Sequence, residues 1–397
     1  MADKILSPDE FYKKLTKEDK SAIVDLQNRK GIDLIPTGSW IVNYLIGDGT
    51  LKGKPGGFPR GHIVEVFGDE SCGKSTLALS AIREAQNLGG LGVLMDFERT
   101  FHADYAERMG ISTEKNKLIV LQPDHFEGGA RLIKDSLLMK PFIIVADSVS
   151  AMTPKQMLEG AVDEATGIGL QARLMSYFLS HISKFLKESN TCLLFTNQLR
   201  SVIKKTKFDG GPDEESSGGR ALKFYASVRL LLKKSKVERL NVKSRLTGAE
   251  GKEPINVTIK ATVVKNKIDK PYLSAPIYIR FGEGIDNVIS LIRLAVNTGL
   301  IKKSGSFFTY SEGTEVLLKI QGEDKLRDAL LDNEKLLNKI QGNMSIKEDV
   351  AVKEAYEALG EELPSVDEMD AMFNQVSTTY IEDQKDKKKK KEEKEED

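Results

Sequence analysis

The chain has 397 residues, and its 59 basic and 59 acidic side chains cancel to a formal net charge of zero. Hydrophobic residues at 40% and charged residues at 30% are typical of a folded globular protein, which excludes a disordered or fibrous chain. No window approaches the about 18 uncharged apolar residues of a membrane-spanning helix, and the first residues lack the apolar segment of a secretory signal. Two cysteines exclude a disulfide framework, so we expect a cytoplasmic protein without a membrane partner.

The first part of the chain predicts a helical element over residues 1–35. Within it, residues 8–30 place apolar side chains at helical spacing in a charged background. A helix this polar has little to bury by itself, so it either docks on a neighbouring subunit or frays.

Residues 36–285 predict an α/β core, because short apolar runs alternate with amphipathic helical stretches. Strands are predicted at 62–68, 91–97, 118–123, 142–148 and 192–198, and helices at 75–88, 102–110, 128–139 and 171–188. Apolar strands separated by helices predict a mostly parallel central sheet with helices on both faces. Strand follows strand over 227–281, which predicts that the sheet ends in antiparallel strands.

Two further segments follow the core. Residues 286–345 contain helical patterns around one short aromatic strand, which predicts a small C-terminal α/β domain. Residues 346–397 end in blocks of lysine and glutamate, and such a charged tail is expected to be largely disordered.

A phosphate-binding loop is the strongest local motif. Residues 68–75 read GDESCGKS and fit the pattern G-x-x-x-x-G-K-[ST], between an apolar strand and a helix. Backbone N–H groups of such a loop surround phosphate oxygens, the lysine reaches the outer phosphates, and the serine hydroxyl ligates Mg²⁺. The predicted nucleotide-binding residues are Gly68, Asp69, Glu70, Ser71, Cys72, Gly73, Lys74, Ser75 and Thr76.

Carboxylates at two other strand ends complete this site. Asp147 ends the apolar run FIIVAD and is the candidate second Mg²⁺ ligand beside Ser75. Asp96 and Glu98 close the strand LGVLMDF, and a carboxylate at that edge of the sheet points into the same crevice. We assign Glu98 as the general base for hydrolysis, with helix capping as the competing interpretation.

The chain resembles the bacterial RecA recombinases. The resemblance rests on the motifs PTGSW, FPRGHIVEVFGDESCGKSTLAL, IIVADSVSAMTPK, FTNQLR, GGRALKFYASVRL and TVVKNKI, which run from about residue 36 to 345. It implies a RecA-type ATPase core with an N-terminal oligomerisation element and a small C-terminal domain. It also implies DNA-dependent hydrolysis of ATP with Mg²⁺, assembly into filaments on single-stranded DNA, and strand exchange in recombination and repair.

The resemblance assigns further roles to individual residues. Gln198 matches the glutamine that senses the γ-phosphate, and Tyr105 matches the tyrosine that stacks on adenine. Lys265 and Lys267 match lysines that reach the ATP of the neighbouring subunit, and as alternate residues of one strand they should project together. The residues that match the interface positions are Lys223, Phe224 and Arg229.

Two segments, 159–169 and 200–219, are predicted to be DNA-binding loops. The second combines cations, apolar groups and glycines, which is the composition that single-stranded nucleic acid requires, although a solvated loop has a similar composition. The candidate DNA-binding residues are Ile168, Arg173, Ser176, Arg200, Ile203, Lys204, Lys205, Lys207, Phe208, Gly218, Gly219 and Arg220.

Several positions depart from the family pattern and indicate a divergent member, such as one encoded by a phage. Ser180 stands where an arginine is frequent, and His102 where an aspartate commonly contacts adenine. By the resemblance the expected partners are single-stranded DNA, double-stranded DNA and further copies of the chain in a nucleoid-associated filament. Single-strand-binding and loader proteins are further candidates. The alternatives are a non-filamentous motor or regulatory ATPase, and a recombination mediator scaffold.

Overall fold

The computed structural model describes Ser7, Glu10, Lys13 and residues 31–47, 56–160, 164–201, 214–216, 219–243 and 250–344. The chain divides into two compact units, Met1–Asp33 and Leu34–Asp397. In the first unit, the Ser7 amide donates to Glu10 Oε2 (2.9 Å) and the Glu10 amide donates to Ser7 Oγ (3.3 Å). This reciprocal arrangement is a capping box, and it agrees with a helix beginning near residue 8. The rest of the predicted helix and the tail at 346–397 lie outside the described residues.

A large mixed sheet forms the centre of the second unit, in the order β12-β11-β10-β9-β3-β7-β6-β4-β5. Its parallel part pairs β5 with β4, β4 with β6, β6 with β7, β7 with β3, and β3 with β9. The parallel strands are β3 (Ile63–Gly68), β4 (Gly92–Asp96), β5 (Leu118–Leu121), β6 (Ile143–Asp147), β7 (Cys192–Ser201) and β9 (Val228–Lys243). The predicted mostly parallel α/β core is therefore confirmed.

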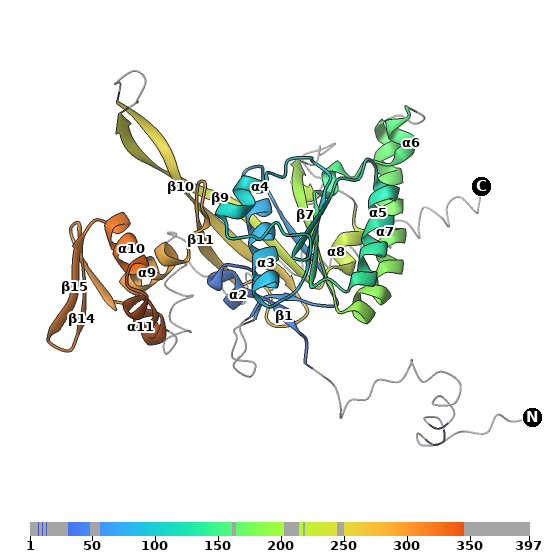
Figure 1. Cartoon of the computed structure of the whole chain (residues 1–397). Helices are drawn as coiled ribbons and strands as arrows, with labels where there is room; N and C mark the ends of the chain where they lie inside the picture. The colour runs from blue at the N-terminus through green and yellow to red at the C-terminus, as the bar shows by residue number, and fades with distance from the viewer. Residues whose placement is uncertain are drawn as a thin grey trace, which may run out of the picture. The chain divides into compact units, whose positions relative to one another are not determined.

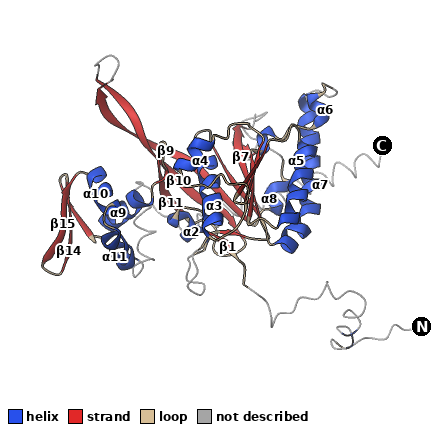
Figure 2. Ribbon diagram, in the orientation of Figure 1, coloured by secondary structure: helices blue, strands red, loops and turns tan. Residues whose placement is uncertain are grey.

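Alternate residues of the central parallel strands β4, β5, β6 and β7 enter two different hydrophobic cores. In β6, for example, Ile143 and Val145 pack in one core, and Ile144 and Ala146 in the other. Figure 2 shows the helices that cover the two faces of the strands. The first face carries α2 (Trp40–Ile46) and α3 (Lys74–Asn87), and the second carries α5 (Phe126–Ser136) and α7 (Glu164–Ser189). This two-sided burial explains why the central strands are mostly apolar.

The antiparallel end of the sheet contains a long hairpin that the sequence analysis placed correctly but made too short. β9 pairs with β10 (Glu250–Asn266) over nearly its full length, whereas β3 accompanies β9 only as far as Leu232. β11 (Ser274–Arg280) and β12 (Gly284–Ile285) complete the edge. Beyond the sheet, β9 and β10 continue as a two-stranded arm (Figure 1).

Residues 287–344 form the C-terminal domain around its own hydrophobic core. Its elements are α9 (Asn287–Asn297), β13 (Ile301–Ser304), β14 (Phe307–Glu312), β15 (Glu315–Gln321), α10 (Glu323–Leu331) and α11 (Glu334–Met344). The predicted aromatic strand is β14, but it lies between two strands that were not predicted. The helical pattern at 323–340 is two helices. The first ends at Leu331 with Asp332 as its C-cap, and Asn333 precedes the second, with its Oδ1 accepting from the Leu336 amide (3.1 Å).

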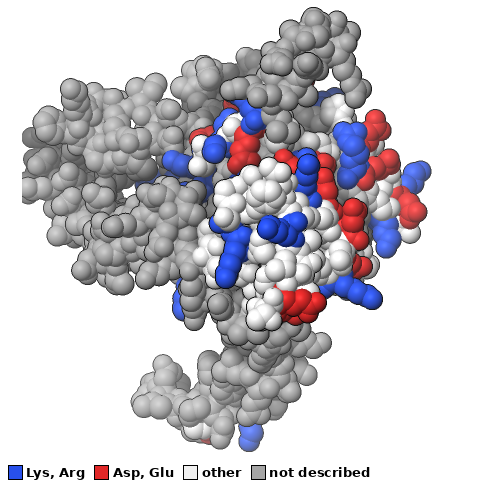
Figure 3. Space-filling view, turned by 90° about the vertical axis from the view of Figure 1, so that its left-hand side faces the viewer, with Lys and Arg blue, Asp and Glu red and all other residues white. Residues whose placement is uncertain are grey.

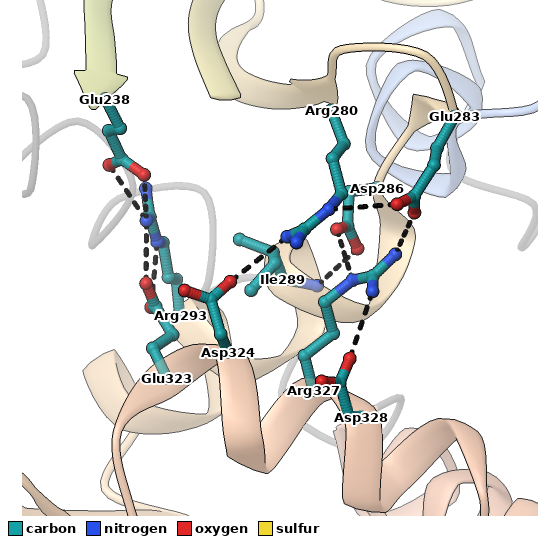
Figure 4. Close-up of polar contacts among 10 residues, drawn as sticks. All are labelled: Glu238, Arg280, Glu283, Asp286, Ile289, Arg293, Glu323, Asp324, Arg327 and Asp328. Atoms are coloured by element: carbon teal, nitrogen blue, oxygen red, sulfur yellow. Dashed lines mark hydrogen bonds and ion pairs between the residues drawn. The ribbon is translucent and has the colours of Figure 1, made fainter. Parts of the chain in front are cut away.

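Ion pairs join this domain to the sheet (Figure 4). Arg293 of α9 bonds Glu238 of β9 and Glu323 of α10, both at 2.8–3.0 Å, and its guanidinium lies 4.4 Å from the ring centroid of Tyr278 in β11. Arg280 of β11 bonds Asp324 (3.0 Å). Charge-assisted hydrogen bonds, together with apolar packing, thus connect the C-terminal domain to β9 and β11 of the sheet.

Charge on the surface is mixed rather than segregated. On the face in Figure 3, basic and acidic side chains are interspersed among uncharged ones over the described residues, as the neutral total suggests. No helix in the described part of the chain has the length and apolar character needed to cross a membrane.

Candidate nucleotide and DNA site

The phosphate-binding loop joins β3 to α3 and is shaped by its glycines. Gly68 has φ +155, and a Cβ there would lie 1.9 Å from the carbonyl oxygen of Leu232, so only glycine fits. Gly73 has φ +81 and precedes α3, whose first N–H groups receive no side-chain cap from it. A loop with left-handed backbone and uncapped helical N–H groups is suited to surround an anion.

Lys74 lies inside this loop. Its side chain is only 9% exposed, and its Nζ donates to the carbonyl oxygens of Gly68 (3.1 Å) and Asp69, with Cys72 Sγ at 3.8 Å. Burial raises the pKa of the Cys72 thiol, which the Lys74 charge opposes. Backbone carbonyls therefore hold the ammonium group where outer phosphates would lie in a nucleotide complex.

Asp147 ends β6 directly beside this loop. Burial raises the pKa of its carboxyl, and hydrogen bonds from Thr196 and from Ser75 oppose that rise. Ser75 and Asp147 are thus in direct contact, as a shared Mg²⁺ site requires. A hydroxyl oxygen and a carboxylate are ligands that suit Mg²⁺, which is usually held by one or two protein groups together with substrate phosphates.

The two candidate carboxylates after β4 have different surroundings. Both oxygens of Asp96 are engaged, since Oδ1 accepts from the Thr100 amide (3.1 Å), and Oδ2 from the Phe101 amide (3.1 Å) and from Gln122 Nε2 (3.0 Å). Glu98 is exposed and accepts a hydrogen bond from Ser148 Oγ, next to Asp147. Asp96 is structural, so the geometry favours Glu98 as the group that can reach a water molecule.

Gln198 stands beside the phosphate-binding loop, because β3 and β7 pair Gly68 with Gln198. The backbone N–H of Gln198 donates to Asn197 Oδ1 (2.9 Å), and Asn197 Nδ2 donates to a carboxylate oxygen of the buried Glu65 (2.9 Å). Arg229 Nε donates to the other oxygen of Glu65 (2.5 Å). This chain of contacts links Arg229, predicted at the interface, to the backbone of Gln198.

Tyr105 belongs to α4 (Ala103–Arg108) and lies against the first turn of α3. Its hydroxyl is 3.4 Å from Thr76 Oγ1. Its half-buried ring is therefore next to the loop, which is compatible with the predicted stacking on adenine. His102 precedes this helix and makes no side-chain capping hydrogen bond.

Lys265 and Lys267 lie near α8 (Ala221–Tyr225). Lys265 Nζ donates to the carbonyl oxygens of Lys223 (2.7 Å) and Phe224 (3.0 Å), while the Phe224 side chain is 66% exposed. Burial, and then the charges of Lys267 and Arg229, lower the pKa of Lys265 to about 8. The strand β10 ends at Asn266, so Lys267 lies just beyond it, and its charge acts on Lys265. That the two lysines project together stays a prediction.

The DNA-binding candidates divide into described and undescribed residues. Arg173 and Ser176 are exposed on α7, and Arg220 is exposed at the start of α8. Gly219 meets α7, since a Cβ on it would lie 2.8 Å from the Cβ of Ala172. The side chains of Ile168 and Arg200, and residues Ile203, Lys204, Lys205, Lys207, Phe208 and Gly218, lie outside the described residues.

Both predicted DNA loops are shorter than expected. α7 begins at Glu164, so the prediction of a loop over 164–169 is wrong, because Glu164, Ala165 and Leu170 favour helix and extend the pattern of 171–188 upstream. In the second segment, β8 (Glu214–Ser216) pairs antiparallel with the end of β7, from Leu199 to Ser201. Two paired strands therefore form the base of this segment.

Four functional positions were missed in the sequence. Ser148 holds Glu98, Thr196 holds Asp147, and Glu65 and Asn197 support Gln198. A signal existed for Thr196 alone, because it is two residues before Gln198 and shares its strand face.

The comparisons with known proteins agree with one another. A family model described as the RecA N-terminal domain matches residues 10–286, and one described as the RecA C-terminal domain matches residues 289–349. Protein RecA of Thermus thermophilus is 39% identical over 336 residues, which are 84% of this chain and 91% of that protein. Protein RecA of Corynebacterium glutamicum is 39% identical over 348 residues, 87% of this chain and 84% of that protein.

Proposed function

The chain belongs to the RecA family, and we propose that it polymerises on single-stranded DNA with ATP and Mg²⁺ at its phosphate-binding loop and exchanges strands between homologous DNA molecules. As a member of this family it is a DNA-dependent ATPase that binds DNA, oligomerises, and acts in recombination and repair. The relatives do not favour the alternatives of a motor, a regulatory ATPase or a mediator scaffold.

One observation supports the proposed site above all others: the functional groups meet at the carboxyl edge of the parallel sheet. The register pairs Gly68 with Gln198 and Asp96 with Asp147, so the loop after β3 and the ends of β4, β6 and β7 are adjacent. In open α/β sheets, ligands bind at this edge.

We assign the steps of hydrolysis to these groups. Lys74 and the first N–H groups of α3 bind the phosphate oxygens of ATP, and Ser75 and Asp147 hold Mg²⁺. The ion, when bound, neutralises charge that develops on the transferring phosphoryl group. Glu98, oriented by the Ser148 hydroxyl, accepts the proton of the attacking water. Gln198 is placed beside the loop to report the state of the γ-phosphate to the segment that follows it.

The remaining sequence predictions are part of the same proposal. Phe224 and Lys223 contact a neighbouring subunit, and Lys265 and Lys267 reach the nucleotide bound there. Single-stranded DNA binds along the two predicted loop segments, and double-stranded DNA is a further partner. Single-strand-binding and loader proteins assist assembly.

The test is steady-state ATP hydrolysis with and without single-stranded DNA at two salt concentrations. We expect strong stimulation by DNA that weakens with salt, since phosphate contacts release counterions. Glu98→Gln should lower stimulated turnover by about 10²–10⁴-fold while ATP and DNA still bind. The matched control is Glu114→Gln, an exposed carboxylate outside the crevice, which should leave turnover unchanged. Hydrolysis indifferent to DNA would contradict the proposal.

A further inference from the structure

An aromatic pair on α7 is exposed and has no part in the site described above. Tyr177 is 67% exposed, more than any other Phe, Tyr or Trp side chain that the structure describes. The ring of His181, one helical turn further on, stacks on it with centroids 4.1 Å apart and an interplanar angle of 37°. A single exposed ring is ordinary on a protein surface, so the inference rests on what surrounds Tyr177.

The pair is held in place by the helix backbone. His181 Nδ1 lies 2.8 Å from the carbonyl oxygen of Tyr177, and because a carbonyl can only accept, Nδ1 carries the hydrogen. Ser180 Oγ donates to the same carbonyl (2.8 Å) and lies 3.1 Å from Nδ1. These hydrogen bonds fix the His181 ring on the helix, and the Tyr177 ring lies against it before any partner binds, which lowers the entropy cost of binding on the pair.

The face of α7 that carries these rings also carries the predicted DNA contacts. Arg173, Tyr177 and His181 are spaced four residues apart, so they line one side of the helix over about 12 Å. Ser176, Ser180 and Lys184 are exposed on the same side. Positive charge at Arg173 and Lys184 is offset only in part, by Glu188, which lies 3.9 Å from Lys184.

This face begins where the second predicted DNA segment ends. Gly219 lies against Ala172, immediately before Arg173, and the first predicted segment leads directly into α7. A strand passing between these segments would continue along the side of the helix that Tyr177 occupies. Exposed aromatic rings beside cations are what single-stranded nucleic acid requires, because bases stack on the rings while the cations bind phosphates.

We propose that Tyr177 and His181 form a base-stacking platform that extends the single-stranded DNA path along α7. The proposal rests on the proposed DNA-binding function and deepens it. A base stacks on the Tyr177 ring, and the His181 ring supports the Tyr177 ring on its other side. The platform supplies affinity at a point of the helix where Ser180 offers no cation.

The experiment measures the affinity of the full-length chain for fluorescein-labelled oligothymidylate by anisotropy, with a non-hydrolysable ATP analogue, over a range of salt. Tyr177→Ala should weaken binding by about 5- to 150-fold, the range for loss of one stacked base. Tyr177→Phe should restore wild-type affinity, because it keeps the ring. His181→Ala should weaken binding less than Tyr177→Ala, since it removes only the support.

The salt dependence separates stacking from phosphate binding. Tyr177→Ala should lower affinity equally at all salt concentrations, so the slope of log affinity against log salt stays that of the wild type. Arg173→Gln should reduce that slope by about 0.7, the value for one phosphate contact with a single strand. Phe307→Leu, which removes an exposed ring of the C-terminal domain, is the matched control and should change neither quantity.

Two results would overturn the proposal. One is wild-type affinity in Tyr177→Ala while Arg173→Gln is impaired, which leaves the DNA-binding function intact and excludes the platform. The other is loss of self-assembly by Tyr177→Ala without DNA, measured by sedimentation, which would make this face a contact between subunits. Failure of the wild-type chain to bind DNA would refute the proposed function itself.

Discussion

Replacing Arg229 by methionine should destabilise the core, because it leaves the Glu65 carboxylate without its cation. Glu65 is fully buried, and in the described part of the chain its two carboxylate oxygens accept hydrogen bonds from Asn197 and Arg229. Removing one partner of a buried ion pair costs about 3–5 kcal/mol, since the remaining charge is desolvated and uncompensated. Loss of the guanidinium from the face of the Phe67 ring, 4.5 Å from its centroid, adds about 0.5–1 kcal/mol.

The double variant is the stronger test of this reasoning. Glu65→Gln with Arg229→Met removes both charges, so its cost should be about 2–3 kcal/mol smaller than the sum of the single variants. The assay is urea unfolding followed by far-ultraviolet circular dichroism, with the slope against urea checked for constancy. Arg239→Met, an exposed arginine of the same strand, is the control and should cost no more than about 0.5 kcal/mol. The expected loss in the free energy of unfolding for Arg229→Met is about 3–5 kcal/mol, so a measured loss below about 1 kcal/mol would refute the argument.

Three further outcomes follow from the contacts around the site and the C-terminal domain. Thr196→Val should raise the Mg²⁺ concentration for half-maximal hydrolysis by about 10–100-fold, because Asp147 loses a hydrogen bond that orients it. The control Thr196→Ser keeps the hydroxyl and should stay near the wild type. An unchanged Mg²⁺ dependence in Thr196→Val would contradict this role. In the nucleotide-free chain, the lowered pKa of Lys265 means that half of its amine should be neutral and reactive at about pH 8. Labelling of Lys265 by an amine reagent, measured by mass spectrometry, should therefore rise through about pH 8, whereas ordinary lysines react above about pH 10. Arg293→Met should weaken the docking of the C-terminal domain by about 2–3 kcal/mol, seen as faster amide hydrogen exchange in α9 and α10, and unchanged protection there would show that apolar packing alone holds the domain.

The amino-acid pattern alone was enough to predict the central strands and helices and to propose most residues of the nucleotide site. Strands β3 to β7 are mostly apolar because both of their faces are buried, and this makes them visible as short apolar runs between helices. The phosphate-binding loop, Asp147 and Glu98 were identifiable because each follows such a run directly. The order of parallel strands then brings their carboxyl ends together.

The polar groups that support that site became identifiable only from the folded chain. Ser148, Thr196, Asn197 and Glu65 act across strands that are far apart in sequence, for instance over the 132 positions that separate Asn197 from Glu65. No local pattern encodes such a pairing, because the strand order sets it. The distinction between Asp96 and Glu98 was likewise decided by which carboxylate the backbone amides of the following turn already occupy.

The same reason explains the errors at the edges of elements. The start of α7 and the division between α10 and α11 depend on capping and on neighbouring contacts that add only about 1 kcal/mol each. The arm of β9 and β10 does not stand out in the sequence as an apolar run, because its paired strands carry charged residues such as Arg239, Glu250 and Glu253. Core residues can be predicted from the sequence because burial requires apolar side chains. The polar residues that pair across the sheet are set by the strand order, which forms only when the chain folds.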